Sequence, residues 1–240
     1  MVRIFFFSCL LFTNYSILHA KEITLNTTGV PPLNTPQQTG FMDLVSKEAF
    51  NRIGYTLKTV KLPAERGLKN VNLGIEDGEM SRIKGLDKTY TNLIRIPEKI
   101  MDWEFVAFSQ NNIKISSKWT SLSSYTVAFI NGWKILENNI PKQTDITKVK
   151  NHQQLFTTLI KNRADLVLYE RWGGLLHISK NPKLKAIKLH HPPLAKKEMF
   201  IYLHKKHKNI INKLQNSLLS MKRDGSYQSI VNKILKPLEK

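Results

Sequence analysis

Apolar and polar positions along the chain predict strands and helices in turn. Residues 23–27 alternate in strand fashion and stop before Pro31-Pro32, which cannot continue a ladder. Apolar side chains recur at helical spacing from Phe41 onward, and residues 55–60 give a second strand before a short helix that ends at Gly74. This β-α-β-α order favours a parallel sheet with helices on its faces, and so an α/β fold.

The rest of the chain continues the pattern. Residues 125–130 are apolar enough for a strand buried on both faces, and Asn151 with Gln154 resembles the capping box of a helix. Residues 164–169 and 199–203 are the next predicted strands. Two helices should follow, the first with a lysine-rich outer face.

Two stretches 88 residues apart share one skeleton, residues 71–79 and 159–170. In each, a helix closes on a residue that tolerates the left-handed conformation, Gly74 or Asn162, and Asp77 or Asp165 then leads into a buried segment. A helix that ends on such a residue before a buried strand is common in α/β proteins. Its recurrence nevertheless predicts two lobes built on one plan, which would bind a ligand between them at the carboxyl ends of their strands.

Polar residues 109–118 and the proline-marked residues 190–193 predict the crossings between these lobes. Residues 21–108 and 196–240 should form the first lobe, and residues 109–195 the second. The first lobe would then contain both ends of the chain.

The first twenty residues have the pattern of a cleavable export signal. Arg3 precedes an apolar run, and Leu18-His19-Ala20 is a small-residue cleavage end. Cys9, the only cysteine, lies inside this segment, so neither a disulfide nor a thiolate metal site is expected after cleavage. We expect a soluble periplasmic protein that starts at Lys21.

The formal net charge is +19, and from Lys180 onward fifteen Lys or Arg residues face three acids. Such a balance suits nucleic acid, an anionic surface or a solvated basic face. Export argues against nucleic acid. Apolar residues keep a helical period among these lysines, at Ile211, Leu214, Leu218 and Met221, which favours the solvated face of a packed helix.

Four motifs in order resemble the bacterial extracellular solute-binding proteins of family 3, which serve many amino-acid ABC transporters. They are Gly40-Phe41 leading into Asp43, Glu65-Arg66 with Gly74 and Asp77 behind it, Arg163-Ala-Asp165 five residues before Glu170, and residues 224–228. The resemblance covers nearly all of the chain after residue 20. It implies a two-lobed type II periplasmic-binding-protein fold with two crossover strands, closing on its ligand by hinge motion.

The resemblance places Glu170 where the family pairs a ligand amino group. Family members that bind amino acids usually carry an arginine a dozen residues after the first-lobe aspartate, where this sequence has Thr89. Arg82 comes earlier and Arg95 later, and either guanidinium could reach a ligand anion. Trp133 follows Gly132 where the family often has small hydroxyl residues, and its ring could stack on a flat ligand.

Each candidate has a second interpretation. The partner of Glu170 is either a ligand ammonium or Arg171, and Arg66 either contacts ligand or pairs with Glu65. Glu79 and Arg82 suit a zwitterion but could neutralise each other. Trp133 and Trp172 are lobe core or ligand platform.

No motif for a metal, a phosphate or a nucleophile occurs. We therefore expect no cofactor and no catalytic residue. The predicted function is capture of a small polar solute by a monomer that serves an inner-membrane permease. The alternatives are a dehydratase-like enzyme with Glu170 as general acid, or a ligand-sensing subunit for a membrane receptor.

Overall fold

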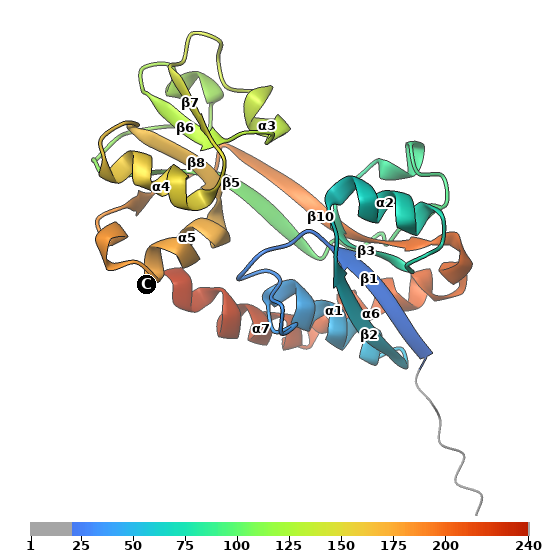
Figure 1. Cartoon of the computed structure of the whole chain (residues 1–240). Coiled ribbons are helices and arrows are strands. Elements are labelled where there is room, and N and C mark those ends of the chain that lie inside the picture. Colours follow the sequence, from blue (N-terminus) through green and yellow to red (C-terminus); the bar gives the residue numbers. More distant parts are fainter. Residues whose placement is uncertain (1–20, 240) are drawn as a thin grey trace, which may run out of the picture.

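The computed structural model describes residues 21–239 and shows two lobes joined by two long strands (Figure 1). The crossing strands are β5 (Met101–Ser109) and β10 (Ala195–His204), which pair antiparallel over Met101–Phe105 and Ala195–Met199. Their outer halves pair with different partners: β10 joins β3 and β4 in the first lobe, and β5 joins β8 and β9 in the second.

The first lobe contains both ends of the described chain. Its strands are β1 (Lys21–Thr27), β2 (Tyr55–Lys61), β3 (Gly78–Arg82) and β4 (Leu93–Arg95). Its α-helices are α1 (Phe41–Asn51), α2 (Ala64–Asn72), α6 (Ile211–Arg223) and α7 (Ser226–Ile234). Short 3₁₀ turns are η1 (Leu86–Lys88), η4 (Lys205–Ile210) and η5 (Lys236–Glu239).

The second lobe has the same kind of order. Its strands are β6 (Val127–Ile130), β7 (Ile146–Val149), β8 (Leu166–Glu170) and β9 (Lys188–Leu189). Its helices are α3 (Lys134–Glu137), α4 (His152–Ile160) and α5 (Arg171–Ser179), with the 3₁₀ turns η2 (Trp119–Leu122) and η3 (Pro182–Leu184).

Sheet topology repeats between the lobes. The strands run β2-β1-β3-β10-β5-β8-β6-β7. In the first lobe β1 is parallel to β2 and β3, and in the second β6 is parallel to β7 and β8. An antiparallel crossing strand closes each parallel set, β10 against β3 and β5 against β8.

The skeleton found in the sequence forms one structure in both places. The Asp77 carboxylate accepts the Thr24 backbone N–H at 2.8 Å, and the Asp165 carboxylate accepts that of Thr126 at 2.9 Å. Gly74 and Asn162 both have positive φ, 78° and 50°. Each aspartate therefore ties the start of its strand to the neighbouring strand, because its side chain replaces a missing ladder partner.

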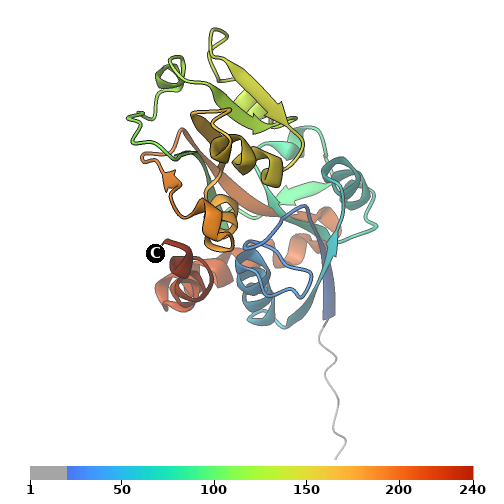
Figure 2. The ribbon, with the colours of Figure 1, turned by 60° about the vertical axis from the view of Figure 1, so that its left-hand side comes forward.

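Helices cover both faces of each sheet. In the first lobe α1, α6 and α7 pack over one core, and Leu68 and Val71 of α2 pack on the other face. In the second lobe α4 and α5 lie on the face opposite α3 (Figure 2). Leu214, Leu218 and Met221 of α6 are buried, as their spacing predicts.

Most predicted elements are present, but the strands β7 and β9 and the helix α5 were not predicted. The helix α5 begins at Arg171, two residues after the end of the strand predicted over residues 164–169. Phe105 to Phe108 pack with second-lobe residues. The division of the chain at residues 108 and 195 stays a prediction, and the proposed export signal lies outside the described residues. Among residues 21–239, no helix is long and apolar enough to cross a membrane.

Candidate ligand-binding cleft

The crossing strands present two chemically different faces. Because side chains alternate along a strand, Trp103 and Phe105 of β5 share one face, and Lys197 lies opposite Trp103 on β10. The other face carries charged residues: Asp102, Glu104, Lys196 and Glu198. The first face forms the floor of a cavity between the lobes, and the second forms an ion-pair cluster behind it.

The cleft cavity has a volume of about 380 Å³. The first lobe, the crossing strands and α3 of the second lobe all contribute to it, and α2 and α3 approach each other above β10 (Figure 1). Its lining residues are Thr28, Leu68, Ser81, Arg82, Ile83, Leu86, Trp103, Phe105, Ile135, Lys197 and Met199. The volume lies within the ~300–1,000 Å³ of ordinary ligand pockets.

Larger hollows exist, but they do not lie between the two sheets. One of about 690 Å³ is lined by α1, β2 and α7 within the first lobe, and one of about 520 Å³ lies beside α5 and the chain end. Among the hollows described for residues 21–239, only the cleft cavity is lined by residues of both lobes and of the two crossing strands. It is the candidate site on the ground of position.

Arg82 is the guanidinium of the cleft cavity and is held by Glu79. Its Nε donates to Glu79 Oε2 at 3.0 Å, Nη2 lies 2.9 Å from the same oxygen, and Nη2 also donates to the Ala64 carbonyl at 3.2 Å. Glu79 and Arg82 therefore neutralise each other, which was one of the two interpretations of the sequence. Nη1 of Arg82 has no hydrogen-bond partner among the described residues.

Glu79 lies under the cleft cavity rather than in its wall. Its side chain is 1% exposed, and burial raises the pKa of its carboxyl, against the opposing effect of Arg82. Oε1 has no hydrogen-bond partner in the described part of the chain. A Cβ on Gly67 would lie 2.5 Å from this oxygen, so the glycine lets α2 pack directly over the carboxylate.

Two polar groups of the cleft cavity are buried without a partner. Ser81 Oγ and Trp103 Nε1 are shielded from solvent, and within residues 21–239 neither makes a hydrogen bond. Buried polar atoms are nearly always paired, by protein, by water or by a ligand. Both residues line the cleft cavity, and neither atom has a competing partner among residues 21–239.

Glu170 does not line the cleft cavity. Its carboxylate caps α5, accepting the backbone N–H of Trp172 at 3.0 Å and of Gly173 at 2.8 Å. Burial raises the pKa of Glu170 to about 7 despite these two bonds. Arg171, one of the two partners expected from the sequence, makes no hydrogen bond to Glu170 and pairs with Glu104 and Glu239. A ligand-binding role for Glu170 stays a prediction.

Arg171 belongs to the ion-pair cluster behind the cleft. It donates to Glu104 of β5 at 2.7 Å and to Glu239 of η5 at 2.6 Å, and its guanidinium lies over the Trp172 ring at 4.7 Å. Burial alone would raise the pKa of Glu104, but hydrogen bonds from Arg171 and Lys196 outweigh it and lower that pKa. Through Glu239, the end of the described chain is tied to the second lobe.

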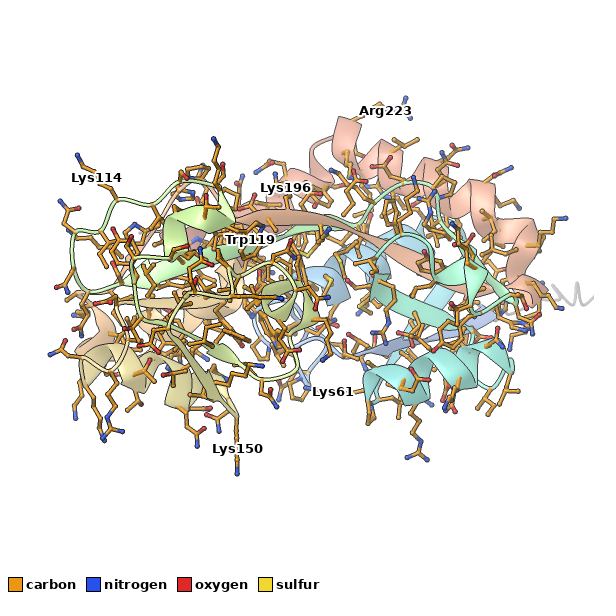
Figure 3. All side chains as sticks on the ribbon, turned by 90° about the horizontal axis from the view of Figure 1, so that it is seen from above. Lys61, Lys114, Trp119, Lys150, Lys196 and Arg223 are labelled. Atoms are coloured by element: carbon orange, nitrogen blue, oxygen red, sulfur yellow. The ribbon has the colours of Figure 1, made fainter. Side chains whose placement is uncertain are left out.

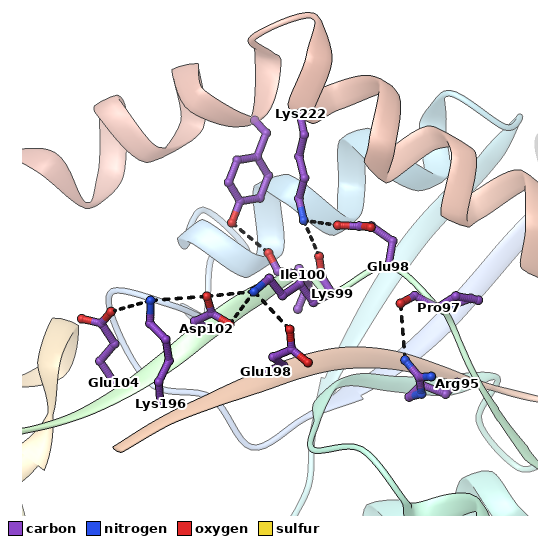
Figure 4. A network of polar contacts seen from close by, with 11 residues as sticks. Arg95, Pro97, Glu98, Lys99, Ile100, Asp102, Glu104, Lys196, Glu198 and Lys222 are labelled. Carbon is purple, nitrogen blue, oxygen red and sulfur yellow. Dashed lines mark hydrogen bonds and ion pairs between the residues drawn. The ribbon is translucent and has the colours of Figure 1, made fainter. Parts of the chain in front are cut away.

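Figure 4 shows the rest of this cluster. Lys196 lies 3.1 Å from Glu104 and 3.6 Å from Asp102, and Lys99 bridges Asp102 and Glu198 at 2.9 and 3.2 Å. These charges come from β5, β10 and the residues just before β5, so they hold the crossing strands together opposite the cleft.

The remaining candidates are not among the lining residues of the cleft cavity. Trp133 stacks on Tyr169 with ring centroids 5.0 Å apart and meets Phe105 edge to face at 5.7 Å, so it packs in the second lobe. Arg66 is exposed, and its expected partner Glu65 instead contacts Tyr90 and Lys69. Thr89 is exposed after η1. Arg95 lies over the Phe200 ring at 4.4 Å.

Sequence reasoning missed Ser81, Trp103 and Lys197. The alternation Asp102-Trp103-Glu104-Phe105 could have assigned Trp103 and Phe105 to one face, but not the identity of the strand opposite. Among residues 21–239, no group of three or more His, Cys, Asp or Glu side chains could hold a metal ion.

Comparisons with known proteins agree with this architecture. The GluR0 ligand-binding core, in complex with L-glutamate, has a TM-score of 0.73 at 14% identity, over 90% of this chain and 99% of that one. An ancestral arginine-binding protein bound to glutamine has a TM-score of 0.66 at 17% identity, over 89% and 97%. This chain has the same two-lobed fold. The fold predicted from the sequence is confirmed.

An ancestral amino-acid-binding protein described as a precursor of cyclohexadienyl dehydratase matches with a TM-score of 0.66 at 16% identity, over 89% of this chain and 95% of that one. An uncharacterised protein of Shewanella oneidensis is 29% identical over 196 residues, which cover 78% of this chain and 72% of that protein. No family model matches the sequence. The two-lobed chain thus resembles binding proteins mainly in its fold.

Proposed function

We propose that this protein captures a small solute between its two lobes and delivers it without chemical change. The cleft cavity carries the proposal: two lobes and both crossing strands line it, and Ser81 Oγ and Trp103 Nε1 are buried there without partners among the described residues. Solute-binding proteins of this fold close on ligand by hinge motion. The solved neighbours include an ancestral arginine-binding protein bound to glutamine and the GluR0 ligand-binding core in complex with L-glutamate.

The cellular setting is part of the same proposal. Residues 1–20 would direct export and be removed, and the chain from Lys21 would work in the periplasm as a monomer that presents its closed form to an inner-membrane permease. Intact-mass measurement of the periplasmic protein tests the cleavage. A mass that includes residues 1–20, or a lipid on Cys9, would contradict it.

The enzyme alternative loses its main support. It depended on Glu170 as a general acid, and that carboxylate is directed at the backbone amides of α5, while the cleft cavity is lined by no aspartate or glutamate. A general acid must reach the reacting group within hydrogen-bond distance or through one water. We therefore favour binding over catalysis.

The test combines binding with closure. The purified chain would be screened by thermal shift against a library of small solutes, and hits would be measured by calorimetry and small-angle X-ray scattering. We expect a hit to reduce the radius of gyration, and Trp103→Phe to weaken binding about fivefold or more because one desolvated donor is lost. Trp119→Phe, on η2 outside the cleft cavity, is the matched control. A hit that leaves the radius of gyration unchanged, or conversion of the hit to product, would contradict the proposal.

A further inference from the structure

The groups that the cleft cavity offers to a ligand are mostly hydrogen-bond donors. Trp103 Nε1 can only donate, and Arg82 Nη1 carries N–H groups without a partner among residues 21–239. Lys197 adds an ammonium for which the described residues supply no ion pair. Ser81 Oγ can donate or accept. Such a set suits an anionic group, which accepts several hydrogen bonds at once.

Carboxylates near the cleft cavity are already engaged. Glu79 Oε2 is held by Arg82, and with the side chain 1% exposed its other oxygen faces Gly67 rather than the cavity. Glu170 caps α5. An ammonium group in this cavity would meet two cations and no free carboxylate from the lining residues. A charge transferred from water without a counter-charge is strongly disfavoured.

The remaining wall is apolar. Leu68, Ile83, Leu86 and Met199 surround the donors, and the Phe105 ring lies beside Trp103 with centroids 6.4 Å apart. Aromatic and aliphatic walls of this kind accept a hydrophobic ligand body, and a few placed polar groups fix its orientation. The chain as a whole carries a formal net charge of +19, which favours the approach of anions.

We propose that the cleft selects an organic monoanion with an apolar body, of the arylalkyl or branched alkyl carboxylate class, over a zwitterionic amino acid. The proposal rests on the proposed function and assigns its ligand class. Arg82, Ser81, Trp103 and Lys197 hold the anionic group, and the apolar wall holds the body. It replaces the zwitterion expected from the sequence, because Glu170 does not lie in the cavity wall.

Three probes of one size test it: 3-phenylpropionate, phenylalanine and phenethylamine, which differ only in carrying the carboxylate, both groups or the amine. Calorimetry should give at least about tenfold tighter binding of 3-phenylpropionate than of phenylalanine, and the weakest binding for the amine. The pair 4-methylvalerate and leucine repeats the comparison with a branched body.

Variants locate the effect. Lys197→Gln should weaken the binding of 3-phenylpropionate about three- to tenfold, because it removes only a positive charge. The binding of phenethylamine should stay unchanged or become tighter. Lys213→Gln, on the exposed face of α6, is the matched control and should change neither. Arg82→Gln alone would leave Glu79 buried without its cation and would endanger folding. The double variant Arg82→Gln with Glu79→Gln is used instead, and it should also bind 3-phenylpropionate more weakly.

Each other outcome has a defined meaning. If phenylalanine or phenethylamine binds as tightly as 3-phenylpropionate, the anion proposal is overturned but solute capture still stands. The same conclusion follows if neither Lys197→Gln nor Trp103→Phe changes the affinity for 3-phenylpropionate. If none of the three probes binds, the anion proposal also fails. Solute capture itself fails if no member of the wider library closes the lobes in solution, or if a member that binds is converted to product.

Discussion

A single carboxylate, that of Glu170, shows how a local structure changes the meaning of a residue. A charged residue at the end of a buried strand suggests a ligand partner, because an unmatched charge there is costly. The backbone amides of Trp172 and Gly173 donate to this carboxylate, a pairing that the sequence analysis did not consider beside a ligand ammonium or Arg171. The helix N-terminus thereby offsets part of the cost of burying the charge, although burial still raises the pKa of Glu170.

Glu170 predicts a particular pH dependence of stability. The pKa of this carboxyl is about 7 in the folded protein, against an ordinary value of 4.5. The protonated carboxyl therefore contributes stability that is fully present below about pH 4.5 and is lost as the pH rises through 7. We expect the unfolding free energy of the wild type, relative to Glu170→Gln, to fall by up to about 3 kcal/mol between pH 4.5 and 8.

Urea unfolding of both proteins across that range is the measurement. A group far from Glu170 with a lowered pKa, such as Asp77, contributes less stability toward acid in both proteins, and this contribution cancels in the difference. Parallel stability curves would show that the amides of α5 offset the burial of the charge. Under the anion proposal, Glu170→Gln should also bind 3-phenylpropionate within about twofold of the wild type, since Glu170 is not among the lining residues of the cleft cavity.

Among the elements, α5 is the one whose omission from the sequence reading had the largest effect. Its residues include Gly173-Gly174, and glycine costs about 1 kcal/mol in a helix interior relative to alanine, so propensity argued against a helix. Packing overrides that cost: a Cβ on Gly174 would lie 2.3 Å from the Phe108 ring, whose side chain is fully buried. The glycine is there for the close approach of helix and crossing strand.

Gly174→Ala should therefore destabilise the protein although it raises helix propensity. The gain of about 1 kcal/mol is outweighed by overpacking of ~1–3 kcal/mol, because the Phe108 ring also packs against Phe156 at 5.4 Å and has no room to retreat. We expect a net loss of up to about 2 kcal/mol in urea unfolding. Gly173→Ala, whose nearest contact would be 3.1 Å away, is the graded control and should lose less. A Gly174→Ala protein as stable as the Gly173→Ala protein would contradict this account.

Other elements followed from the sequence wherever periodicity was strong. The helices of the first lobe and the strands β1, β2, β6, β8 and β10 match their predicted places, and Asn151 caps α4 by accepting the Gln154 N–H, as its spacing predicts. β7 was missed because Ile146–Val149 is a half-exposed segment of four residues with little pattern to read. The cleft residues Trp103 and Lys197 were missed for another reason, since their proximity depends on the register of β5 against β10, which no local pattern encodes.

On the scale of the whole molecule, positive charge is spread widely. Figure 3 shows Lys114, Lys150 and Arg223 projecting outward from different edges of the protein. A net charge of +19 produces a field that accelerates the encounter with anions and is screened by salt. The charge therefore acts on the rate of capture more than on the contacts made in the cleft.

Under the anion proposal, association of 3-phenylpropionate should slow about three- to tenfold between roughly 0.02 and 0.5 M salt. Stopped-flow tryptophan fluorescence measures it, and the neutral 3-phenylpropionamide is the control that salt should leave nearly unchanged. Equal salt dependence for the two probes would show that the charge of the protein does not steer the ligand.

The contact between Arg171 and Glu239 has a practical consequence for handling this protein. Besides β5 and β10, it is a third physical link between lobes, and it lies at the end of the described chain, beside α5 (Figure 1). A purification tag fused after Lys240 would lie next to the Arg171–Glu239 ion pair and could disturb it. A tag placed before Lys21 would extend from the far end of the first lobe. We expect a carboxyl-terminal tag, but not an amino-terminal one, to change the ligand-induced shift in the radius of gyration. Biosensors built on this scaffold should therefore carry their fluorescent partner at the amino end.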